Sequence, residues 1–270
     1  MKFENIRVHN FENAMRGMRN PKESWDLSDS YYGFEVNDRN AILERTNNQE
    51  FAILHTDNGI AEFASIGPND MKLAQTLIRG GSEHRKFMRE IVVSVDITAP
   101  LYWWKEADTY KVGTVANSTS TMHKIQSKSI SVNLFETDDY NPHLLLMDNS
   151  SVGENVNCFI EVLEQLRKLY LKYNKESKNE NHPEEDRKNY AKLAKMYWKE
   201  LIRWTPEAWM QTRTMTMTYE NLLAMCSRGQ RRFHKLTEWS GDGEEFIHES
   251  FIKFARSLPY AQDFIFIDEL

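Results

Sequence analysis

The chain has 270 residues, of which 40% are hydrophobic, 12% aromatic and 27% charged. This length allows one large domain or two small ones, and the composition excludes a disordered, collagen-like or coiled-coil chain. The formal net charge of −6 argues against a general nucleic-acid binder.

The N-terminal part of the chain mixes short alternating runs with turn residues. Residues 51–55 predict a strand, and residues 41–45 are a candidate for a second strand, with a polar turn at Asn47-Asn48 between them. Residues 70–79 have helical periodicity and precede two glycines, which predicts a helix with a glycine stop. Residues 90–98 are rich in β-branched side chains and predict the clearest strand of the chain.

The later part of the chain is mostly helical in pattern. Residues 101–111 are helix-like in pattern, and Pro100 stands directly before them. Proline suits the first turn of a helix, so its position supports this prediction. Residues 174–188 are polar and charged and predict a solvated loop inserted between two helices. Helices are predicted for residues 154–173, 189–203, 214–226 and 244–256.

Cysteine content and hydropathy bear on the compartment. Cys158 and Cys226 are the two cysteines, which excludes a disulfide scaffold and favours a reducing environment. Residues 1–15 contain no apolar signal region, and no run of 18 apolar residues occurs. We therefore expect a cytoplasmic protein that is neither exported nor bound to a membrane.

Standard chemical motifs are absent. The chain contains no Walker A loop, GxGxxG, HExxH, CxxC or GxSxG sequence. His84, His234 and His248 lack the spacing of metal ligands, so no metal site is predicted.

Basic and aromatic residues gather in two windows. Residues 68–130 hold nine lysines and arginines against six acidic residues, and residues 195–239 hold eight against four. The same windows contain six of the seven tryptophans. Cations interleaved with aromatic rings suit an anion that carries a flat ring system, such as a nucleotide or a flavin. The alternative, a tryptophan core beneath a solvated basic face, fits the composition equally well.

The order of segments in these windows resembles the flavin-dependent thymidylate synthases. In the first window the resemblance lies in residues 70–81, 82–87, 91–98, 99–105 and 109–122. In the second it lies in residues 205–206, 214–218, 219–223, Arg228 and 234–238. It covers residues 69–125 and 190–240, a little under half of the chain.

The chain departs from the family's signature, Arg-His-Arg followed after seven residues by serine. Thr109-Tyr110-Lys111 stands in place of the first three residues, and Thr119, flanked by Ser118 and Ser120, in place of the serine. Lysine keeps the positive charge but loses the planar fork that binds phosphate through two hydrogen bonds. Asn117-Ser118 corresponds to the family's Asn-Glu, so the acid is lost.

The resemblance implies a single α/β (α+β) domain over residues 1–270, with a mainly antiparallel sheet flanked by helices. It also implies a homotetramer that binds FAD and converts the pyrimidine deoxynucleotide dUMP to dTMP, using methylenetetrahydrofolate and NADPH. Reduced flavin delivers hydride and the folate supplies the one-carbon unit, so no catalytic nucleophile is expected from the protein.

Candidate site residues follow from the same resemblance. The cofactor candidates are His84, Arg85, Tyr110, Lys111 and Asn221. The substrate candidates are Asn117, Ser118, Thr119, Ser120, Arg228, Arg231 and Arg232. The hydroxyl run also fits a simple turn, and Arg231-Arg232 fits a surface pair. Two rival functions stay open: a repurposed or inactive homologue that binds a nucleotide or another ligand without flavin, and a structural protein that binds no nucleotide.

Overall fold

The computed structural model describes residues 1–227, 232–241 and 248–270. The chain separates into two compact units, the first made of residues 1–97, 105–117 and 213–270 and the second of residues 98–104 and 118–212. The boundary falls within β5 (Val92–Pro100), α4 (Leu101–Ala107), β6 (Val115–Ser118) and β7 (Met210–Thr218). The single domain expected for residues 1–270 stays a prediction.

The larger sheet has the strand order β1-β5-β7-β6, with β1 at Lys2–His9. Along β5 the side chains of Val93, Val95 and Ile97 are fully buried and alternate with half-buried residues. Side chains of a strand point alternately to its two faces, so this pattern places one face of β5 against the core. The strand predicted for residues 90–98 is confirmed.

The smaller sheet of the first unit is antiparallel, with β4 (Ile60–Ser65) between β2 (Tyr31–Val36) and β3 (Ala52–Asp57). Its hydrophobic cluster joins Ala61 and Phe63 to Ile42 of α2 (Arg39–Arg45). The candidate strand at residues 41–45 is therefore wrong, because Asp38 accepts hydrogen bonds from the amides of Asn40 and Ala41 and starts a helix there.

An aromatic cluster fills the core of the first unit. It joins Phe11 of α1 (Phe11–Arg19), Tyr219 of α8 (Tyr219–Met225) and Phe264 of α11 (Ala261–Phe264). Beside it, Arg19 donates to the buried Asp70 of α3 (Pro68–Arg79) at 2.6 Å. The predicted helix at 70–79 is confirmed. The described part of this unit also contains α9 (Thr237–Ser240) and α10 (Phe251–Arg256).

Part of the predicted helix at residues 244–256 lies outside the described residues. In the part that is described, α10 begins at Phe251, because the Ser250 side chain accepts a hydrogen bond from the amide of Lys253.

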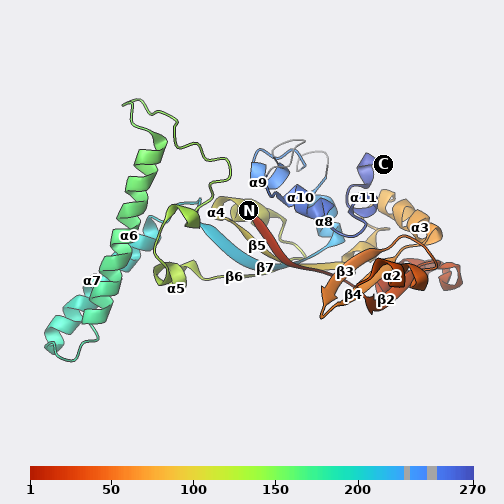
Figure 1. The fold of residues 1–270 in the computed structure, drawn as a ribbon, viewed down its shortest axis with the longest axis horizontal. Helices are drawn as coiled ribbons and strands as arrows, with labels where there is room; N and C mark the ends of the chain where they lie inside the picture. The colour runs from red at the N-terminus through yellow and green to blue at the C-terminus, as the bar shows by residue number, and fades with distance from the viewer. Residues whose placement is uncertain (228–231, 242–247) are drawn as a thin grey trace. The chain divides into compact units, whose positions relative to one another are not determined.

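Two long helices dominate the second unit. In Figure 1, α6 (Val152–Glu176) and α7 (Glu184–Arg203) lie side by side, and the rings of Tyr173 and Tyr197 stack with centroids 5.5 Å apart. Each helix extends into the polar segment predicted as a loop at 174–188, so the connection spans residues 177–183. No helix in the described part of the chain is both long enough and apolar enough to span a membrane.

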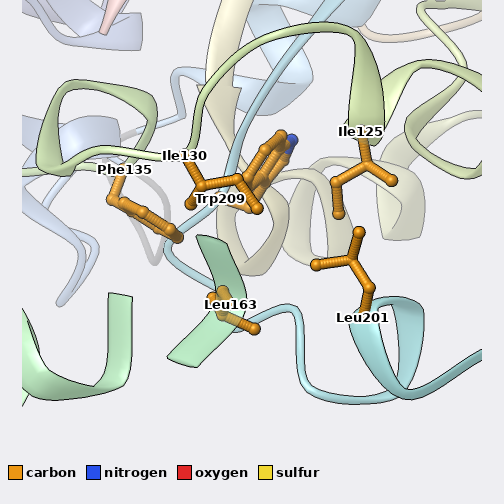
Figure 2. Close-up of a cluster of buried hydrophobic side chains, with 6 residues drawn as sticks. All are labelled: Ile125, Ile130, Phe135, Leu163, Leu201 and Trp209. Atoms are coloured by element: carbon orange, nitrogen blue, oxygen red, sulfur yellow. The ribbon is translucent and has the colours of Figure 1, made fainter. Parts of the chain in front are cut away.

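A hydrophobic cluster holds these helices to the rest of the second unit (Figure 2). Leu163 of α6 and Leu201 of α7 meet Trp209, whose ring lies edge-on to Phe135 with centroids 5.5 Å apart. Ile125 and Ile130 complete the cluster. Ile125 follows the short helix α5 (Thr121–Lys124), so the cluster also fixes the segment after it.

The helix predicted for residues 214–226 is wrong over its first five residues. Residues 214–218 form the end of β7, where Met215 and Met217 are buried and alternate with threonines. Threonine is β-branched and favours strands, and the period of two fits a half-buried strand better than a helix. Thr218 then caps α8, which begins at Tyr219.

Candidate functional site

Two arginines between α3 and β5 converge on one carboxylate at the start of α8. Arg85 Nε donates to Glu220 Oε1 at 3.2 Å. Arg89 donates to both oxygens of Glu220, from Nη2 to Oε1 at 3.3 Å and from Nε to Oε2. His84, the neighbouring candidate, is exposed, and its ring lies close to Gly80. The predicted cofactor residue Arg85 is therefore part of an ion-pair network.

The Glu220 carboxyl is held in its ionised form. Burial alone would raise the pKa of Glu220, but the hydrogen bonds from Arg89 and Arg85 outweigh that effect and lower the pKa below its usual value. The Arg89 guanidinium is also attracted by the carboxylate of Glu83, so two carboxylates act on the two arginines.

The Asn221 side chain forms hydrogen bonds with backbone groups around it. Its Oδ1 accepts the amide of Thr218 at 3.0 Å in the capping box of α8, and its Nδ2 donates to the carbonyl of Val112 at 2.8 Å. Val112 follows Lys111, so this bond ties the Lys111 turn to the start of α8. Gly113 in the same turn has φ +82°, a left-handed conformation that favours glycine.

The side chains of Lys111 and Tyr110 differ in their contacts with the rest of the chain. Lys111 is exposed, and its ammonium forms no ion pair with any residue that the structure describes. The Tyr110 hydroxyl donates to Glu106 Oε1 at 3.0 Å, and its ring meets the buried Trp239 edge-on at 5.4 Å. His234 Nε2 lies 3.4 Å from the same Glu106 oxygen. Tyr110 is thus a fixed ring, and Lys111 is a cation available to a ligand.

Of the three candidate phosphate arginines, Arg232 alone lies in the described residues, and Arg228 and Arg231 lie outside them. Arg232 is buried, with Nη1 donating to Glu269 at 2.7 Å and Nη2 to Asp268 at 2.6 Å. Its Nε donates to the Cys226 carbonyl at 3.1 Å. All three nitrogens of the guanidinium are therefore engaged within the chain.

The hydroxyl run of the substrate candidates extends from β6 into the second unit. Asn117 and Ser118 are exposed at the end of β6. Thr119 and Ser120 line a pocket of about 340 Å³ whose lining lies wholly in the second unit. Thr119 Oγ1 donates to the Thr212 carbonyl at 3.1 Å, while Ser120 Oγ accepts the amide of His123. The structure thus brings two of the four candidates to one cavity.

Two lysines that sequence reasoning did not single out share this pocket. Lys124 and Lys128 line it together with further hydroxyl and apolar residues, namely Thr121, Ile125, Ser127, Leu134, Trp209, Met210 and Thr212. Neither ammonium has an ion-pair partner among the residues described. Free cations beside hydroxyls and an indole ring suit a phosphorylated ring compound. Both lysines fall within the basic window at 68–130, and that excess of basic residues is the sequence feature that could have identified them.

An ion pair on α6 holds the Lys128 side of the pocket in place. Arg167 donates to both oxygens of Glu164 at 2.7 Å and to the Gln126 carbonyl at 3.1 Å. Glu164 Oε2 also accepts the amide of Ile130 at 2.8 Å. The hydrogen bonds from Arg167 lower the pKa of Glu164. The pair therefore fixes residues 126–130 against the helix.

Helices combined with antiparallel sheets define an α+β fold, as the sequence predicts. The crystal structure of flavin-dependent thymidylate synthase ThyX from Helicobacter pylori, complexed with FAD and dUMP, has this fold. It matches the chain with a TM-score of 0.54 and 14% sequence identity, over 99% of each chain. Thymidylate synthase X from the same bacterium, with FAD and dUMP, matches with a TM-score of 0.48 and 16% identity, over 99% of this chain and 98% of that one. No protein-family model and no curated protein sequence matches the chain.

Residues of the first unit include cationic groups that can bind phosphate. Arg85 and Arg89 pair with Glu220, Arg89 is also attracted by Glu83, and Lys111 is exposed in the turn that Asn221 ties to the start of α8. Arginine and lysine donate charge-assisted hydrogen bonds to phosphate, and the shared carboxylate fixes the two arginines in position. The local chemistry is that of an anion site.

Proposed function

We propose that the chain is a diverged flavin-dependent thymidylate synthase-like enzyme that binds FAD and the pyrimidine deoxynucleotide dUMP. The observation that carries the proposal is the likeness in fold, over 99% of both chains, to an enzyme crystallised with FAD and dUMP. In the proposed reaction the methylene carbon of methylenetetrahydrofolate becomes the methyl group of dTMP, and NADPH supplies two electrons. FAD, when bound, would relay these electrons as hydride.

The first unit would hold the cofactor. Lys111 and the arginine pair Arg85 and Arg89 would neutralise its pyrophosphate, and Glu220 would keep the two guanidinium groups oriented. Tyr110, fixed against Trp239, would offer a ring surface, and His84 an exposed imidazole. Asn221 would act through the turn that carries Lys111.

The pocket of the second unit would receive the nucleotide. Lys124 and Lys128 would meet its phosphate as point charges, and the hydroxyls of Thr119 and Ser120 would donate to or accept from the pyrimidine edge. The side chains of Asn117 and Ser118, which precede this run in the chain, are exposed. Trp209 gives the pocket an aromatic wall.

Binding of FAD is the first test. We expect purified protein to retain flavin absorption bands after addition of FAD and removal of unbound flavin by gel filtration, and Lys111→Ala to weaken FAD affinity about tenfold, because a charge-assisted hydrogen bond is lost. Lys192→Ala, at an exposed lysine of α7, is the control and should bind like the parent protein. Absence of flavin bands, or equal affinity of both variants, would contradict the cofactor assignment.

Nucleotide binding is measured separately. We expect dUMP to raise the melting temperature, and the double variant Lys124→Ala/Lys128→Ala to abolish that rise. A dUMP effect that survives the double variant would exclude this pocket.

We further expect the protein to be a homotetramer, as measured by light scattering, and to be located in the cytoplasm.

The alternative is a homologue that binds a nucleotide without flavin catalysis. It is favoured by Glu220, which engages both Arg85 and Arg89, and by the replacement of the signature with Thr109-Tyr110-Lys111. Formation of dTMP that depends on NADPH and methylenetetrahydrofolate would exclude this alternative. A dUMP-induced shift without FAD binding would support it.

A further inference from the structure

Two imidazoles and a carboxylate converge beside the small sheet of the first unit. They belong to His9 at the end of β1, His55 of β3 and Glu62 of β4. One nitrogen or oxygen atom from each lies within 4.8 Å of the other two, and all three residues are half-buried. Imidazole and carboxylate are the usual ligands of zinc-like ions, and half-buried groups of this kind are poorly hydrated by bulk water.

The backbone sets this convergence. His55 and Glu62 are opposite one another in the antiparallel pairing of β3 and β4, and the register shifts between Ile53 and His55. Directly opposed residues point to the same face of a sheet, and a bulge re-aims the side chain beside it. The rings of His9 and His55 lie with centroids 5.2 Å apart and are tilted by 60° to one another.

The spacing of two donor atoms fits an ion better than a hydrogen bond. His55 Nδ1 is buried and lies 3.3 Å from Glu62 Oε2, yet it has no hydrogen-bond partner among the described residues. Two ligands bound tetrahedrally at the 2.0–2.1 Å typical of zinc lie about 3.3 Å apart. A buried nitrogen without a partner is costly, and a bound cation would satisfy it.

A cavity adjoins two of the three groups, His9 and Glu62. It has a volume of about 270 Å³ and is lined by His9 and Glu62, together with Asn10, Asn13 and other residues. Three protein ligands at a zinc ion leave the fourth position to water or to a small ligand, and this cavity would supply the space.

We propose that His9, His55 and Glu62 form a binding site for a divalent transition-metal ion, with Zn²⁺ as the best-matched ion and a fourth position open to the cavity. The site lies among residues that the flavin and nucleotide proposal does not use. Imidazole donors favour zinc and its neighbours over magnesium and calcium, which prefer oxygen. The ion would also join β1 to the small sheet.

The test uses the full chain without a histidine tag, treated with EDTA and desalted. We expect isothermal titration with Zn²⁺ to give one ion per chain, and Co²⁺ to give the visible absorption of a tetrahedral complex. His9→Gln, His55→Gln and Glu62→Gln should each weaken Zn²⁺ binding about 100-fold or more, since even outer-shell partners contribute 10–100-fold. His143→Gln, at an exposed histidine of the second unit, should bind like the parent.

A second readout separates metal binding from misfolding. Zn²⁺ should raise the melting temperature of the parent and of His143→Gln but not of Glu62→Gln, whose circular dichroism without metal should match the parent. No uptake of Zn²⁺ by the parent would overturn the proposal and leave His55 and Glu62 as a simple polar pair. Uptake that is equal in all three ligand variants would overturn it as well.

Discussion

At the scale of single residues, Glu220 links stability to pH. Its pKa is lower in the folded protein than in the unfolded chain, because Arg89 and Arg85 donate hydrogen bonds to it against the opposing effect of burial. The ion pairs therefore contribute fully above the unfolded pKa of about 4.3. That contribution is lost as the pH falls through the lower, folded value.

Replacing the carboxyl should remove this dependence. We expect Glu220→Gln to be less stable than the parent at pH 7, and its urea midpoint to fall less steeply below about pH 5. Arg89→Gln should change the profile in the same direction, because it removes the larger of the two favourable hydrogen-bonding contributions. Parallel stability profiles for the parent and Glu220→Gln would refute the assignment.

Of the predicted substrate residues, Thr119 and Ser120, which are adjacent in the chain, line the pocket of the second unit. Their role in binding, like that of Asn117, Ser118 and Lys111, stays a prediction from the resemblance. Lys128 reaches the pocket because Arg167 and Glu164 hold its loop to α6, and no local pattern encodes that contact. His55 and Glu62 meet through strand pairing and a register shift, which is equally invisible in local composition.

At the scale of elements, the α6–α7 pair depends on the cluster in Figure 2. Leu163 is 1% exposed and packs there with Leu201 and Trp209. We expect Leu163→Ala to lower the free energy of unfolding by about 2–5 kcal/mol, because it removes buried methyl groups and leaves a cavity. Leu171→Ala, at a residue of α6 that is 37% exposed, is the matched control in urea unfolding. Equal losses would contradict the role of the cluster.

Elements with a long, regular period were predictable, and of the short ones the strand at 51–55 was found as β3 while the strand at 41–45 was not. The predicted helix at 154–173 lies within α6. It was predictable because its apolar residues recur over several turns, and Ser151 with Glu154 forms a capping box at its start. Residues 41–45 are too few for periodicity to separate helix from strand, and the cap at Asp38 decides for helix. At 214–218 the alternation of threonine and methionine indicates the strand that the structure shows, whereas the predicted helix there is wrong.

Within the first unit, Arg232 joins segments that are far apart in the sequence. Besides its bonds to Asp268 and Glu269, its guanidinium lies 5.0 Å from the ring centre of Phe266, and Arg256 shares Glu269 at 2.8 Å. A buried guanidinium that donates from each of its three nitrogens and whose charge is met by two carboxylates stabilises a fold through its partners. The geometry therefore favours a structural role over the phosphate role that the sequence predicts.

Replacing Asp268 and Glu269 with their amides distinguishes a structural role of Arg232 from a phosphate-binding role. We expect Asp268→Asn/Glu269→Gln to lower the free energy of unfolding by about 1–3 kcal/mol, a range below that of a fully buried pair because both carboxylates are partly exposed. Affinity for dUMP should stay unchanged. The control is Glu249→Gln, which removes the partly exposed partner of Lys253 and should change stability little. If the double variant instead binds dUMP more tightly than the parent, the acids compete with a ligand phosphate for Arg232, and that arginine belongs to the nucleotide site.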